Sequence, residues 1–231
     1  MDVFDDLDDA ALADQCAAMT PVQRRHAATL ALWRLHAPLL MLAIDPDWGL
    51  HRTVLERVFR AMVPAPGEEE PYHAYPEAVA EMLSAPFFAD PQEGEPDGGV
   101  ATVQVHLLVE LMEWKPWEEL DAEKTERIIH LPREVSSWLD SGTQSMLWDH
   151  PARRAHEAFL AAWPDQGRGP ELGYHSVRNL TVEGACHEIV LALPPSADLW
   201  DTAAGREALA LCEAFSVELV STLAWQHNLG H

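Results

Sequence analysis

The chain contains one long and mostly apolar stretch, Thr20–Ile44, which reads TPVQRRHAATLALWRLHAPLLMLAI. Its first two residues suit the start of a helix, because threonine is a good N-cap and proline is tolerated at the first helical position. Apolar side chains then occur on every side of the helix, so we expect it to be buried on most faces. Pro38 lacks the amide hydrogen that would bond to the carbonyl of Arg34, which predicts a kink at Pro38.

Two polar residues, Arg34 and His36, lie within this apolar stretch. They argue against a membrane span, since a central arginine alone costs about 2.5–3.5 kcal/mol on insertion scales. A buried arginine needs a counter-charge, and we expect Arg34 to pair with an acid from another helix. The alternative is a ligand carboxylate or phosphate, which would make Arg34 and His36 the polar groups of a ligand site.

Apolar residues recur at helical spacing on both sides of this stretch. Helices are predicted near residues 5–18, 50–62, 76–83, 100–114, 121–139, 151–163 and 202–228. Residues 181–193 are ambiguous between a helix capped by Thr181 and a strand, with a short strand possible near 186–192, because Ile189–Leu191 suits both. We therefore expect an all-α fold, in which residues 1–231 form a single globular domain of eight or nine helices.

Acidic residues outnumber basic ones throughout most of the chain. With 38 acids, 15 bases and a formal net charge of −23, the protein is repelled by phosphate backbones and by anionic membranes. Neither nucleic acid nor a membrane is therefore an expected partner. The three cysteines have no CxxC spacing, and the acidic N-terminus does not resemble a signal peptide, so we expect a cytoplasmic location.

The acidity is concentrated in an irregular segment, residues 64–99. This segment holds nine acids and no lysine or arginine, together with seven prolines and four glycines that interrupt regular structure. Its acids form the candidate surface for a basic protein partner: Glu68, Glu69, Glu70, Asp90, Glu93, Glu95 and Asp97. The preferred hypothesis is an acidic interaction module, with an immunity or inhibitor protein as its concrete form.

Histidines and acids four residues apart share a helix face and can hold a metal ion. Three such pairs fall on predicted helices: His106/Glu110, Glu126/His130 and Glu183/His187. Their number is close to what chance gives in so acidic a chain, and none has the Glu-x-x-His spacing of di-iron proteins. Structural or solvent-exposed pairs are the favoured interpretation, and we predict no metal site and no cofactor.

The second hypothesis is a small-molecule-binding protein or enzyme. Its pocket would lie between helices and be lined by tryptophan and methionine, with Arg34, His36 or a Glu–His pair as the polar group. No nucleotide-binding loop, nucleophile elbow or HExxH motif occurs, so the sequence favours a protein that is not an enzyme without deciding the matter. The nine tryptophans also leave a homodimer open.

Three short motifs carry a resemblance to a known family. They are Leu32–Leu35 (LWRL), Asp47–Gly49 (DWG) and Leu55–Phe59 (LERVF). Over residues 29–60 the chain resembles an uncharacterised all-helical bacterial family, domain of unknown function 416. The resemblance covers less than a third of the chain and implies an all-helical fold, in which Val105–Glu113 would correspond to the next buried helix. It implies no activity and no site residue.

Overall fold

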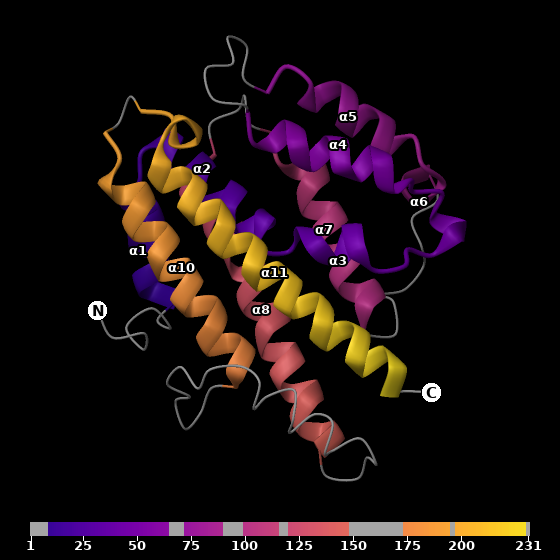
Figure 1. Cartoon of the computed structure of the whole chain (residues 1–231). Coiled ribbons are helices and arrows are strands. Elements are labelled where there is room, and N and C mark those ends of the chain that lie inside the picture. The colour runs from indigo at the N-terminus through magenta and orange to yellow at the C-terminus, as the bar shows by residue number, and fades with distance from the viewer. Residues whose placement is uncertain are drawn as a thin grey trace.

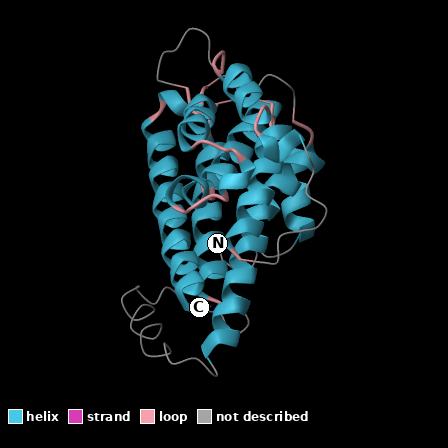
Figure 2. Ribbon diagram, turned by 90° about the vertical axis from the view of Figure 1, so that its right-hand side faces the viewer, coloured by secondary structure: helices cyan, strands magenta, loops and turns pink. Residues whose placement is uncertain are grey.

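The computed structural model describes residues 9–64, 72–89, 99–115, 120–147, 173–194 and 197–229. Regular structure in these ranges is entirely helical (Figure 2). The α-helices are α1 (Asp9–Ala18), α2 (Pro21–Trp33), α3 (His36–Met41), α4 (Arg52–Met62), α5 (Tyr75–Leu83), α6 (Pro86–Ala89), α7 (Val100–Glu113), α8 (Ala122–Leu147), α10 (Tyr174–Ala192) and α11 (Ala203–Leu229). Two short 3₁₀ turns, Pro46–Trp48 and Leu199–Asp201, complete the described elements. The all-α prediction is confirmed.

Helix α2 begins where the sequence predicts. The hydroxyl of Thr20 accepts a hydrogen bond from the backbone N–H of Gln23 at 3.3 Å, and the Gln23 side chain accepts one from the Thr20 N–H at 2.9 Å. This reciprocal capping box satisfies two amide groups that a helix start would otherwise leave unpaired. From His26 to Leu32 the helix is buried on all sides. The stretch is thus the centre of the core.

The helix breaks one turn before Pro38, where the sequence predicts a kink. Helix α2 ends at Trp33, the backbone at Leu35 leaves the helical region with φ −115° and ψ 6°, and α3 starts at His36. Pro38 is therefore in the first turn of α3, where a helix needs no amide donor. Because its ring would also clash with the carbonyl of Arg34, the break falls in the turn before the proline.

Three long helices pack beside α2. Figure 1 shows α10 and α11 as an antiparallel pair, with α8 running alongside. Helices α4 and α5 form a second pair, and α7 lies against α3 and α5 (Figure 1). The most apolar part of α11, Ala203–Gln226, is long enough to cross a membrane by length and composition. Half of it is buried inside the protein against α2, α3 and α10, as expected for a core helix.

Of the two structures left open for residues 181–193, the helix is confirmed and the short strand near 186–192 is wrong, because these residues belong to α10. The helix starts seven residues before Thr181, whose hydroxyl donates to the Val177 carbonyl inside the helix instead of capping its start. Val182, Cys186 and Val190 are four residues apart and all buried, so the segment has a helical core face. Its β-branched residues are also compatible with a strand, and only packing separates the two.

Other boundaries differ from prediction in length and number. Helix α8 continues past the expected end at Leu139 to Leu147, and it accommodates Pro132 in its interior, where Ser136 donates to the Pro132 carbonyl at 2.6 Å. The described ranges hold ten α-helices against the eight or nine expected, because the central stretch divides and α6 adds a turn. The short helix near 76–83 is confirmed as α5. The expected helix at 151–163 lies outside the described residues.

Candidate functional site

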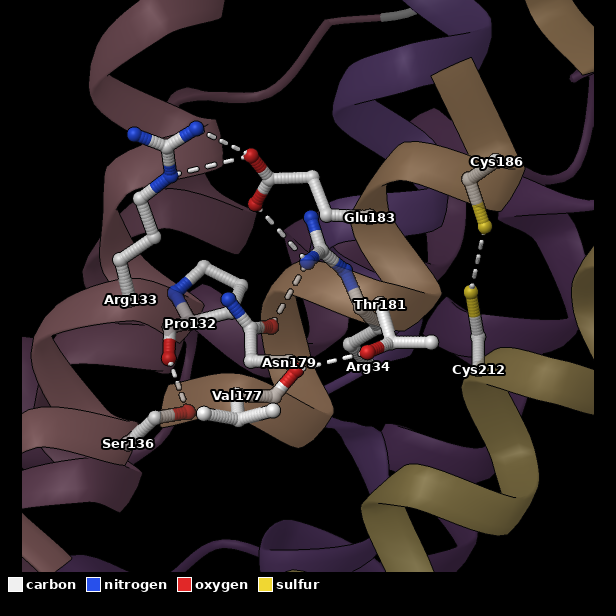
Figure 3. Close-up of polar contacts among 10 residues, drawn as sticks. All are labelled: Arg34, Pro132, Arg133, Ser136, Val177, Asn179, Thr181, Glu183, Cys186 and Cys212. Carbon is white, nitrogen blue, oxygen red and sulfur yellow. Dashed lines mark hydrogen bonds and ion pairs between the residues drawn. The ribbon is translucent and has the colours of Figure 1, made fainter. Parts of the chain in front are cut away.

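Arg34 is held by protein groups at the centre of the helical core. Its Nη1 atom donates to Oε2 of Glu183 at 3.0 Å and to Oδ1 of Asn179 at 2.7 Å (Figure 3). Both Arg34 and Glu183 are 1% exposed. Figure 3 shows the two acceptors side by side on α10, facing the arginine. The expected pairing with an acid from another helix is confirmed.

A second arginine completes this buried cluster. Arg133 of α8 donates from Nε to Oε1 of Glu183 at 3.0 Å and also from its Nη2 (Figure 3). Burial opposes ionisation of Glu183, but the two guanidinium groups outweigh it and hold the pKa of Glu183 below its usual range. The carboxylate is therefore charged and joins α2, α8 and α10, and it is not available to a ligand.

His187 is the partner of Glu183 in one of the pairs considered for metal binding. Burial lowers the pKa of His187 to about 4, against the attraction of Glu183, and Arg34 and Arg133 lower it further. The imidazole is neutral near pH 7. Because Glu183 is already engaged by two arginines, this pair is structural.

His36 also faces protein groups. Its Nδ1 atom lies 2.6 Å from the Trp33 carbonyl oxygen, and its ring stacks on the Trp33 indole with centroids 4.9 Å apart. Phe59 closes another side at 5.8 Å. Burial lowers the pKa of His36, and the bond to the Trp33 carbonyl partly opposes that shift. His36 thus packs against Trp33 and Phe59 at the break between α2 and α3, and it does not line a cavity with Arg34.

An open groove of about 950 Å³ runs between α7 and α8. Its walls carry six carboxylate side chains, two basic side chains and two histidines. They are Glu110, Glu113, Asp121, Glu123, Glu126 and Glu134, with Lys124, Arg127, His106 and His130. Val109 and Leu131 add apolar surface. We call this feature the acidic groove.

Two of the acids in the groove are neutralised within the protein. Arg127 forms ion pairs with Glu110, at 3.2 Å, and with Glu113. Glu126 lies 3.7 Å from His130 across one helical turn. Glu123 and Glu134 are exposed. The negative charge available to a partner is therefore concentrated on α8.

The sequence predicted these groove residues only in part. The helical pairs His106/Glu110 and Glu126/His130 are visible in the sequence, and the structure brings all four residues to one groove. The acids proposed for partner binding, Glu68, Glu69, Glu70, Asp90, Glu93, Glu95 and Asp97, lie outside the described residues. The signal for the groove was the excess of acids in residues 100–141, which hold nine acids and four bases.

Within the described ranges, no three histidine, cysteine or acidic side chains come together in a way that could hold a metal ion. Comparison of the chain with protein-family models, with curated proteins and with solved structures found no match.

Proposed function

We propose that this protein is an acidic interaction module that binds a basic protein partner through the acidic groove. The observation that carries the proposal is the composition of the groove walls, in which six carboxylates face two basic side chains in a volume of about 950 Å³. Opposite charge on the two proteins raises their association rate and favours basic partners over acidic ones.

The groove combines charge with apolar surface. Val109 is 36% exposed, so a partner can bury apolar atoms against it while its basic groups meet Glu123, Glu126 and Glu134. This combination favours a folded or amphipathic basic segment over a simple cation.

The groove walls are fixed by the core, which favours a preformed binding surface. Leu107 and Leu111 of α7 and Ile128 of α8 are completely buried. The Tyr75 hydroxyl donates to the Leu111 carbonyl at 2.9 Å and ties α7 to α5. A partner would therefore meet a rigid surface, and binding would cost little ordering of this protein.

The finer parts of the proposal rest on charge and size. An immunity or inhibitor role, in which the acidic module neutralises a basic toxin or nuclease, suits a chain with a net charge of −23. A cytoplasmic location belongs to the same proposal, as does partner binding by Glu68, Glu69, Glu70, Asp90, Glu93, Glu95 and Asp97. The resemblance to domain of unknown function 416 and the homodimer stay predictions.

The test compares two variants that change the net charge equally. Glu123→Gln/Glu126→Gln/Glu134→Gln removes three charges from the groove, and Glu188→Gln/Glu207→Gln/Glu213→Gln removes three exposed charges from α10 and α11. Each variant and the wild-type protein are used as bait in a pull-down from source cells, and captured proteins are identified by mass spectrometry. We expect a basic protein that the wild type and the α10/α11 variant retain and the groove variant loses.

The captured protein is then purified and titrated into each bait at low and high salt. Affinity should fall with salt for the wild type and fall less steeply for the groove variant. A partner that binds the groove variant as tightly as the α10/α11 variant contradicts the proposal, as does a partner of acidic composition.

A further inference from the structure

A second hollow, of about 390 Å³, lies on the side of the molecule formed by α4 and α5. It lies within the size range of small-molecule pockets, at the lower end. Its lining is mostly apolar, with two arginines and one acid. The lining residues are Arg57, Arg60, Ala61, Val63, Pro64, Tyr72, Ala74, Glu77 and Ala78. We call it the arginine pocket.

The arginines of this pocket are unusual in so acidic a chain. Arg57 forms an ion pair with Glu81 across the α4–α5 interface. Arg60 is exposed, and the described residues provide no ion-pair partner for it. Arg60 lies in the last turn of α4, where a cation is favourable, and it is three residues from Arg57, so the two arginines share one face of the helix. Among the described residues of the lining, the two arginines stand against one acid, Glu77.

Tyr72 lines the pocket with a strained backbone. Its φ of +68° lies in the left-handed region, which costs a bulky residue about 1–3 kcal/mol. Two contacts hold it there: its hydroxyl accepts a hydrogen bond from Trp200 Nε1 at 3.0 Å, and the Arg25 guanidinium carbon lies 5.2 Å from the ring centroid. These contacts hold Tyr72, which is 8% exposed, in place beside the pocket.

We propose that the arginine pocket binds a small organic anion, with its carboxylate or phosphate group on Arg57 and Arg60 and its apolar body against Tyr72 and Ala78. Arginine suits both head groups because its planar fork can donate two parallel hydrogen bonds to either. The apolar walls favour an aromatic or short aliphatic body over inorganic phosphate. The site shares no residue with the acidic groove and does not depend on the proposed function.

The experiment is isothermal titration calorimetry of the full chain with four probes. Phenyl phosphate and benzoate carry the two head groups on one apolar body, inorganic phosphate carries the head group alone, and benzyl alcohol carries the body alone. We expect saturable binding of phenyl phosphate, benzoate or both, and weaker binding of the last two probes. Comparison of the first two probes distinguishes a phosphate ligand from a carboxylate ligand.

Two variants locate the binding. Arg57→Gln/Arg60→Gln should weaken the better probe about tenfold or more, whereas Arg52→Gln/Arg206→Gln, which removes two exposed charges elsewhere, should leave its affinity unchanged. Ala74→Trp, at an exposed position of the lining, should obstruct the pocket without touching the core. The proposal is overturned if neither organic anion saturates below about 10 mM, or if both arginine variants bind alike.

Discussion

Arg34 and Glu183 are 149 residues apart in the chain, yet the Arg34 Nη1 and Glu183 Oε2 atoms lie 3.0 Å apart in the core. The pair joins the end of α2 to the middle of α10, and Arg133 ties α8 to the same carboxylate. One buried acid therefore compensates two cations, of which Arg34 is 1% exposed and Arg133 13%. A buried charge left without its partner is far more costly than an exposed one.

We expect Glu183→Gln to lower the free energy of unfolding by about 3–5 kcal/mol, because it leaves Arg34 buried without a counter-charge. Urea unfolding followed by circular dichroism measures the change. Glu188→Gln is the matched control: it alters an exposed acid of the same helix and should stay within about 0.5 kcal/mol of wild type. Equal effects of the two substitutions would show that the buried pair contributes nothing specific.

A double-mutant cycle separates the pair from its surroundings. Arg34→Met removes the cation and leaves Glu183 with Arg133. The double variant Arg34→Met/Glu183→Gln should be markedly more stable than the sum of the two single losses implies, since residues in one buried network are not additive. Additivity within about 0.5 kcal/mol would contradict a direct interaction.

Stability should fall as the pH falls from about 6.5 to 4 because of His187. The folded protein binds the His187 proton only near pH 4, whereas the unfolded chain binds it near the ordinary value of 6.5. In that window the unfolded state holds more protons, so acid favours unfolding, by about 2 kcal/mol between pH 7 and 5. Urea unfolding at both pH values should show a smaller loss for His187→Asn than for wild type. An identical loss in both proteins would refute this assignment.

We expect Gly173→Ala to destabilise the protein by about 1–3 kcal/mol. Asp140 of α8 accepts from the His175 N–H and the Ser176 N–H, each at 2.9 Å, and so caps the start of α10. A Cβ at position 173 would lie 2.0 Å from the Asp140 carboxyl carbon, so the cap must be displaced. Thermal unfolding measures the effect.

Gly142→Ala is the control for this substitution. A Cβ there would meet Gln226 at an ordinary 3.4 Å, inside α8. Replacing a helical glycine should therefore be neutral or stabilising by up to about 1 kcal/mol. A loss at position 142 as large as that at 173 would point to general packing instead of the Asp140 cap.

The three cysteines should react slowly with a thiol reagent in the native protein and fully after denaturation. Cys16, Cys186 and Cys212 are all buried, and burial, reinforced by Glu126 and Glu183, raises the pKa of Cys16 to about 11. Little Cys16 thiolate is then present at neutral pH, and burial keeps Cys186 and Cys212 from the reagent. Absorbance of released thionitrobenzoate, with and without guanidinium chloride, measures this. Rapid reaction of even one native thiol would contradict the described packing.

Local signals in the sequence were sufficient for most of the helices. The Thr20–Pro21 start signal of α2 and the apolar spacing of α4 and α7 involve residues within a few positions of one another, and such patterns depend on helix geometry alone. The predicted helix boundaries were less accurate where the same residues are compatible with two local structures. Pro38 could kink one helix or start another, and the Ile189–Leu191 run is compatible with a strand or a helix until neighbours cover one face.

The candidate sites were also predicted only in part. The sequence alone established that Arg34 needs a buried partner and that residues 100–141 carry excess acid, because both follow from composition and helical spacing. Only the tertiary structure selected Glu183 as that partner, brought the acids of α7 and α8 to one groove, and placed Arg57, Arg60 and Tyr72 around one cavity. The physical reason is that contacts between distant segments depend on how whole helix faces pack, which no short stretch of sequence encodes.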